Sequence, residues 1–175
     1  LQITMKKLVL FGLMLLVSTI SFGRSHIVDK ANVTVADTLF YSPKHQVVSN
    51  PEKASYYRLL VTVGKGLSKQ DAFVDYYMDG KMKAEGSYSF LDLNNDKNSK
   101  LDGEVITYYT NGKEKLHGKY VNGLREGYFT AQLKDGSIAI IEYRDGKPVY
   151  NYCQLTHPNG EYEKIPLSKL NTILE

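Results

Sequence analysis

The sequence predicts an all-β protein, an elongated antiparallel β-meander of repeated hairpins in a largely single-layer sheet, and it allows a short helix at the C-terminal end. Two observations predict this fold. Asn-Gly or Asp-Gly pairs recur at seven places and use half of the 14 glycines. The segments between these pairs are short and rich in tyrosine and β-branched residues, which is the ordinary composition of strands.

The Asn-Gly and Asp-Gly pairs have a geometric reason. A two-residue type I′ hairpin turn needs positive φ at both central residues, and Asn or Asp followed by Gly adopts it at the lowest cost. We therefore predict turns at the glycines of these pairs, chiefly Gly80, Gly103, Gly112, Gly123, Gly136 and Gly146.

The pattern repeats at a nearly fixed period. Gly103 maps onto Gly127 at a spacing of 24, and Tyr120 maps onto Tyr143 at a spacing of 23. A fixed period in this range is the signature of a repeat architecture.

One irregularity within the repeat concerns strand register. The interval from the turn glycine to the closing tyrosine is eight residues in the first two units and seven in the third. Because strand faces alternate with period two, one lost residue would turn the side chains to the other face unless a bulge absorbs it. We predict bulges at Gly86 and Gly118, which the third unit lacks, and a straight strand through residues 137–143.

The N-terminal residues predict export. Met5 is followed by Lys6 and Lys7, by an apolar run over residues 8–17, and by small and polar residues up to Gly23. This is the pattern of a secretory signal, and the apolar run is shorter than the roughly 20 residues of a membrane-spanning helix. We expect residues 1–23 to be a signal peptide and the protein to be exported, either periplasmic or secreted. A retained anchor helix is the alternative.

The rest of the chain divides into three parts. Residues 24–36 show little periodicity and are expected to form a loose lead-in. The hairpin repeat domain is predicted over residues 37–160, is clearest over 76–149, and carries an extra loop at 91–101. We expect residues 37–63 to join the same sheet. In the tail, residues 161–175, four apolar side chains fall on one helical face: Leu167, Leu170, Ile173 and Leu174.

Charge and cysteine content exclude some classes of protein. The formal net charge is +3, and removal of Lys6 and Lys7 with the signal would leave 3 − 2 = +1. A nearly neutral chain offers no electrostatic footprint for nucleic acid. The only cysteine, Cys153, allows no intramolecular disulfide, and its apolar neighbours favour a buried side chain.

The central unit, YTNGKEKLHGKYVNGLREG at residues 109–127, has the pattern Y-x-x-G-K-x-K-x-x-G-x-Y-x-x-G-x-x-x-G. It resembles the variant MORN repeat of bacterial proteins labelled as YwqK-like antitoxin components. The resemblance covers residues 76–147, with two clear units and a degenerate third. It implies stacked β-hairpins in an elongated single-layer sheet and an interaction or scaffold module without catalytic residues. An antitoxin role conflicts with export, because an exported protein does not meet a cytoplasmic toxin.

The extra loop resembles a calcium-binding loop in part. It places oxygen ligands at alternate positions: Asp92, Asn94, Asp96 and Asn98. It departs from the calcium pattern at the sixth position, where Lys97 replaces the glycine, and at the twelfth, where the glutamate is displaced to Glu104. We expect a solvated hairpin loop, with a weak calcium site as the alternative.

No other motif points to a catalytic or cofactor site. The four histidines are scattered, and we expect no metal site and no cofactor. Five lysines follow the repeat and are expected to keep a sheet edge soluble, or alternatively to meet an anionic ligand: Lys81, Lys83, Lys113, Lys115 and Lys119.

These observations favour an exported, non-enzymatic protein that binds another protein or a cell-envelope component along its sheet. Tyrosines supply rigid, amphipathic contact area, and the candidate binding residues are Tyr108, Tyr109, Tyr120, Tyr128 and Tyr143. The alternatives are an enzyme acting on envelope glycan or peptidoglycan, and a phospholipid-binding module. Open sheet edges also allow dimerisation.

Overall fold

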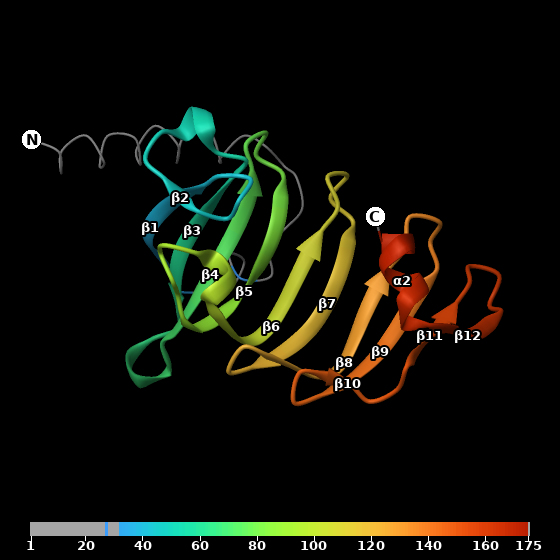
Figure 1. Cartoon of the computed structure of the whole chain (residues 1–175). Helices are drawn as coiled ribbons and strands as arrows, with labels where there is room; N and C mark the ends of the chain where they lie inside the picture. The colour runs from blue at the N-terminus through green and yellow to red at the C-terminus, as the bar shows by residue number, and fades with distance from the viewer. Residues whose placement is uncertain (1–26, 28–31, 175) are drawn as a thin grey trace, which may run out of the picture.

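The computed structural model describes residue 27 and residues 32–174 of the chain. These residues form one strongly curved, open sheet in which every strand pairs antiparallel with its neighbours (Figure 1). The strands are β1 (Val33–Tyr41), β2 (Val47–Val48), β3 (Tyr56–Val63), β4 (Gln70–Tyr77), β5 (Met82–Phe90), β6 (Lys100–Tyr108), β7 (Glu114–Val121), β8 (Leu124–Gln132), β9 (Ile138–Arg144), β10 (Lys147–Pro148), β11 (Tyr152–Thr156) and β12 (Tyr162–Pro166).

The strand order in space follows the order in sequence with few exceptions. From one edge to the other it runs β12, β11, β9, β8, β7, β6, β5, β4, β3, β1 and β2, while β10 pairs with β9 beside this path. One α-helix, α2 (Leu167–Leu174), follows β12, and the connections contain three 3-10 turns: Pro51–Lys53, Gly66–Ser68 and Asp96–Asn98.

The predicted fold class is confirmed, including the short C-terminal helix and the inclusion of residues 37–63 in the same sheet. Two boundaries were wrong. The first strand begins at Val33, inside the predicted lead-in, and the last strand, β12, lies in the predicted tail. The predicted signal peptide, residues 1–23, lies outside the described residues.

The predicted type I′ geometry is found at only two of the seven Asx-Gly pairs. Both residues have positive φ in Asn122-Gly123 and in Asp145-Gly146. Gly103 is not in a turn, because it lies within β6.

The other four pairs belong to longer loops of one kind, at residues 77–81, 109–113, 133–137 and 157–161, where only the glycine has positive φ. In each loop the Asp or Asn side chain accepts a hydrogen bond from the backbone N–H two residues later, as Asp79 does from Lys81 at 3.1 Å. This side-chain bond stabilises a turn that the type I′ rule does not describe. Figure 1 shows the four loops along one rim of the sheet.

The register explains why the repeat intervals differ. Lys83 is an extra, unpaired residue between the pairs that β5 makes with β4, and Lys115 is the equivalent residue between β7 and β6. The pairing of β8 with β9 has no such residue. The interval from turn glycine to tyrosine is therefore one residue longer in the first two units because it contains the unpaired lysine. The predicted straight strand of the third unit is confirmed.

Of the two predicted bulges, Gly118 lies within a register shift, but the extra residues are on the partner strand. Gly86 is paired on both sides, and the shift beside it falls at Ser87. Gly118 pairs without a break with Val105 of β6, whereas its pairing with β8 is interrupted by residues 127–129. Gly118 and Gly86 are glycines for a steric reason: the ring of Phe129 lies over Gly118, and Val105 and Phe73 lie over Gly86, so neither position has room for a Cβ atom.

One face of the sheet, here called the packed face, is buried from β4 to β12. Residues that pair directly across strands share a face, and the central row of this face is buried throughout: Phe73, Gly86, Val105, Gly118, Phe129, Ile141, Cys153 and Ile165. Helix α2 covers the C-terminal end of the row through Leu167 and Leu170. The burial predicted for Cys153 is confirmed.

The opposite face, here called the half-open face, changes character along the sheet. Val74, Glu85 and Ile106 are buried in a core that includes Tyr57, Tyr76, Tyr108 and Ile27. The same row continues across β7 to β12 through residues that are half-buried or exposed: His117, Thr130, Ile140, Gln154 and Lys164.

Candidate functional site

The half-open face exposes a group of apolar and aromatic side chains between β8 and β12. Tyr128 on β8 is 69% exposed, Ile138 on β9 is 41% exposed, and Tyr162 on β12 is 57% exposed. Thr130, Ile140 and Gln154 lie on the same face through direct cross-strand pairing. We call these six residues the open patch: Tyr128, Thr130, Ile138, Ile140, Gln154 and Tyr162.

Strand alternation places these side chains on the surface. In β8, Phe129 and Ala131 pack into the core of the packed face, so Tyr128 and Thr130 must point the other way. Neighbouring strands lie about 4.8 Å apart, so the patch spans about 14 Å from β8 to β12. Aromatic and aliphatic groups beside hydroxyl and amide groups are suited to contact with another molecule, and they offer no reactive group.

Of the five tyrosines predicted to bind, the structure leaves one well exposed, Tyr128. Tyr143 is buried, and its hydroxyl accepts a hydrogen bond from Arg125 Nη1 at 2.7 Å. Tyr120 packs edge-on against Phe129. The Tyr109 hydroxyl donates to the backbone oxygen of Gln132 at 2.7 Å.

The fifth, Tyr108, has a buried ring and donates its hydroxyl hydrogen to Glu85 Oε1 at 2.6 Å. Burial and the neighbouring Glu85 carboxylate raise the pKa of Tyr108. Tyr108 thus joins β6 to β5 inside the core of the half-open face.

Sequence reasoning missed Ile138 and Tyr162. Ile138 is followed by the buried Ala139 in β9. Tyr162 begins β12, in which the buried Ile165 lies three positions further on and therefore on the opposite face. The alternation of β9 could have identified Ile138. Tyr162 could not be assigned because the strand containing it was placed in the tail.

The extra loop does not arrange its oxygens around a common point. Asp92 Oδ1 accepts from the backbone N–H groups of Asn94 and Asn95 at 2.8 and 3.2 Å, and its Oδ2 accepts from the Asn98 amide at 3.0 Å. The Asp96 carboxylate turns away to bind Arg58. Across the part of the chain that the structure describes, no group of three or more His, Cys, Asp or Glu residues is arranged to hold a metal.

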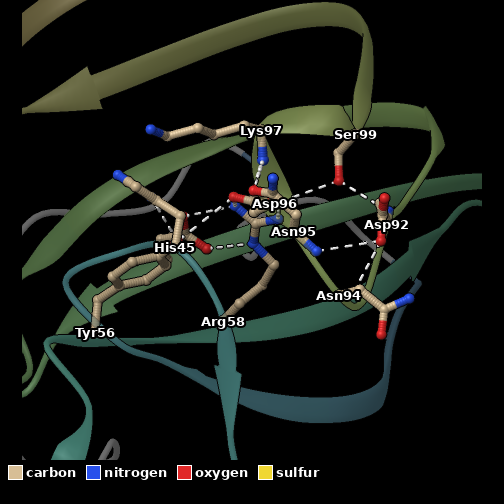
Figure 2. A network of polar contacts seen from close by, with 10 residues as sticks. His45, Tyr56, Arg58, Asp92, Asn94, Asn95, Asp96, Lys97 and Ser99 are labelled. Carbon is tan, nitrogen blue, oxygen red and sulfur yellow. Dashed lines mark hydrogen bonds and ion pairs between the residues drawn. The ribbon is translucent and has the colours of Figure 1, made fainter.

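Arg58 is the centre of a buried charged network on the packed face, next to β1 (Figure 2). Its Nε and Nη2 donate to the two oxygens of Asp75 at 2.7 and 2.9 Å. Its Nη1 and Nη2 donate to the two oxygens of Asp96 at 2.6 and 3.0 Å. The guanidinium also lies over the rings of Phe73 and Tyr41, 4.3 and 5.1 Å from their centres.

The network is electrically balanced. Lys83, whose ammonium lies 4.1 Å from the centre of the Tyr56 ring, adds a second positive charge to that of Arg58. Burial lowers the pKa of Lys83, while attraction from Asp75 and Asp96 opposes this shift. Burial opposes the charge on Arg58, but hydrogen bonds and attraction from Asp75 and Asp96 outweigh it and raise its pKa. Complete burial raises the pKa of Asp75 from its ordinary value of 3.8. The bidentate geometry is nevertheless that of an ionised carboxylate with a guanidinium.

The predicted lysine edge is not continuous. Lys81 forms an ion pair with Asp79 at 2.9 Å in its own turn. Lys83 and Lys115 are the two bulge residues, and each lies against a tyrosine ring. Lys119 lies on the half-open face. In the strand register it stands directly opposite Glu104 on one adjacent strand and Glu126 on the other.

One contact chain resembles a catalytic arrangement. Ser137 Oγ lies 3.2 Å from His157 Nδ1, and His157 Nε2 lies 3.0 Å from Glu163 Oε1. The Ser137 residue is fully buried, and its hydroxyl also lies 3.0 Å from Asp135 Oδ2. A nucleophile must reach its substrate. In this structure the contacts among Ser137, His157 and Glu163 join the two hairpin loops 133–137 and 157–161.

None of the helices within the described residues has the length and apolarity needed to span a membrane. Comparison of the chain with protein-family models, with curated proteins and with solved structures gave no match.

Proposed function

We propose that this protein is an exported, non-enzymatic repeat module of the MORN type that binds another protein or a cell-envelope component through the open patch. One observation carries the proposal: the central row of the packed face is buried from β4 to β12, but aromatic and aliphatic side chains are uncovered on the half-open face from β8 to β12. Exposed apolar groups that cluster on one surface mark interaction sites.

The turn pattern supports the repeat assignment. The hairpin loops 77–81, 109–113, 133–137 and 157–161 share one hydrogen-bond pattern and recur along the sheet. Such a meander has no deep core between layers, and its long face is available for extended contact. Tyr128 and Tyr162 supply rings that lose little conformational freedom on binding.

The test compares capture of material from cell-envelope extract by three versions of the chain. The patch variant carries Tyr128→Ser and Tyr162→Ser. The matched control carries Met78→Ser, which changes a side chain that is 45% exposed in the loop 77–81, outside the patch. We expect the patch variant to lose a specific captured component that the wild type and the control both retain.

An enzymatic role is tested separately with Ser137→Ala and His157→Ala. Hydrolysis of envelope glycan or peptide that disappears in both variants would contradict the proposal. Salt-sensitive sedimentation with anionic vesicles that survives the patch substitutions would also contradict it, because it would place the main interaction elsewhere.

A further inference from the structure

The loop between β5 and β6 is held against the sheet by a charge that a ligand could also supply. We propose that residues 91–99 form a lid over a carboxylate-binding site, in which Arg58, Tyr41 and Tyr56 hold the carboxylate of a ligand in the place that Asp96 takes here. This site lies on the packed face near β1 to β4 and is separate from the open patch.

The two carboxylates on Arg58 have different origins. Asp75 comes from β4, the strand next to Arg58, and occupies Nε and one side of Nη2. Asp96 comes from the loop and occupies Nη1 and the other side of Nη2, which is the bidentate geometry that arginine forms with a free carboxylate. Asp75 therefore orients the guanidinium, and Asp96 fills the position that faces out of the sheet.

A buried hydroxyl beside Arg58 provides independent support. Tyr41 is fully buried. The Arg58 guanidinium lies near its ring and interacts with its hydroxyl oxygen, but no acceptor of regular geometry takes the hydroxyl hydrogen. Buried polar groups in native proteins nearly always have a partner. A ligand carboxylate placed slightly deeper than Asp96 would accept the Tyr41 hydrogen. The Tyr56 hydroxyl already points to Asp96 Oδ2 at 3.5 Å.

The loop is built to move as a unit. Its internal bonds centre on Asp92, which accepts from three groups of the loop itself. Its polar contacts outside the loop are made by Asp96, through the side chain and through its backbone N–H to the oxygen of His45 at 3.2 Å. Leu93, which could have anchored the loop, is 52% exposed.

Charge balance couples opening to binding. With the loop closed, two cations, Arg58 and Lys83, face two carboxylates. Lifting Asp96 would leave one positive charge without a partner inside the protein, which is strongly unfavourable. A ligand carboxylate restores the balance. The rings of Tyr41, Tyr56 and Phe73 around the guanidinium favour a ligand that joins the carboxylate to an aromatic or apolar body.

The first test uses benzoate, acetate and inorganic phosphate as probes on the variant Asp96→Ala, with Asp92→Ala as the control in the same loop. Asp96→Ala should bind benzoate at least tenfold more tightly than the wild type, and acetate and phosphate more weakly than benzoate. Asp92→Ala should behave as the wild type. If Asp96→Ala is poorly folded, benzoate should raise its melting temperature more than chloride does at equal ionic strength. Equal responses of the two variants would overturn the proposal.

The second test separates a lid from a simple ion pair, and it uses the unmodified chain. Benzoate should speed amide hydrogen exchange in residues 92–99 while it slows exchange in β1 and β3. Rescue of Asp96→Ala by benzoate without any change of loop exchange in the wild type would show a structural ion pair only and would overturn the lid.

Discussion

The N-terminal and C-terminal parts of the sheet use the same strand pattern but bury different surfaces. On the half-open face, Val74, Glu85 and Ile106 have 0 to 4% exposure, whereas the His117 side chain one strand further on is 39% exposed. Ile27 packs over the first part, whereas the residues of the open patch in the second part are half-buried or exposed. The surface of a meander therefore depends on what covers each face as well as on its strands.

The packed face differs between the same two parts in a second way. Near β3 and β4 it buries charges, with Arg58 and Asp75 at its centre. From β8 to β12 it buries apolar groups, with Phe129 against Tyr143 and Tyr120. Stability in the first part depends on charge pairing and in the second on tight packing, so different substitutions should damage each part.

The largest effect is expected for Phe129→Ala. The ring is 1% exposed and fills the space over Gly118, so its removal leaves a cavity and should lower the free energy of unfolding by about 3 to 5 kcal/mol. Urea unfolding followed by circular dichroism measures the change. Its neighbour Tyr128 provides the matched control, since Tyr128→Ala should change the free energy by about 0.5 kcal/mol at most. Equal losses for the two variants would contradict the assignment of faces.

A slightly smaller loss is expected for Asp75→Asn. The substitution removes the main carboxylate partner of a buried guanidinium and should cost about 3 kcal/mol. Because the pair is buried, the loss should persist in 1 M salt, where exposed ion pairs are screened. Asp79→Asn removes the exposed partner of Lys81 and serves as the control. A loss at Asp75 that vanished in salt would mean that the network is open to solvent.

Alkaline pH should weaken the N-terminal part. Burial raises the pKa of Tyr41 and of Tyr76 from 10.0 to about 12. A raised tyrosine pKa means that the folded state favours the neutral hydroxyl, so this contribution to stability is complete below pH 10 and is lost as pH rises through about 12. Absorbance at 295 nm should show tyrosines that ionise only near pH 12, together with unfolding. Complete ionisation by pH 11 in the folded chain would contradict this.

Deletion of Lys115 should cost little, about 1 kcal/mol, because this residue forms the bulge that the third unit lacks. Deletion of Ile140 from the straight strand β9 is the control. It should be far more disruptive, because it turns buried side chains such as Ile141 toward solvent. Melting temperatures of the two deletion variants give the comparison, and similar losses would show that Lys115 is not the extra residue.

The smallest effect on stability is expected for the patch variant with Tyr128→Ser and Tyr162→Ser. Both rings are more than half exposed, so the melting temperature should fall by only about 1 to 2 °C. A large fall would mean that the patch is part of the fold, and loss of binding could then not be assigned to it.

The sequence predicted much of the fold because its signals are local. The Asx-Gly pairs and the tyrosine-rich segments between them predicted a β-meander, and the sequence repeat of 23 to 24 residues predicted where β6 to β9 lie. The positions of the bulges were harder to predict from the sequence. The repeat glycine suggested a bulge at Gly118, but glycine is needed there because the ring of Phe129 leaves no room for a side chain.

The sites were harder to predict because they depend on contacts distant in sequence. Arg58 and Asp96 are 38 residues apart, and nothing local shows that the loop folds back onto β3. Of the five candidate tyrosines, two are buried and two are half-buried, because strand alternation shows which side chains share a face but not which face is covered.

We propose that the open patch, and no other surface, contacts the partner. A photo-cross-linking amino acid placed at Tyr128, Ile138 or Tyr162 tests it directly in cells, with Met78 as the exposed control position. We expect one common adduct from the three patch positions and none from position 78. An adduct from position 78 alone, or equal adducts from all four positions, would contradict it.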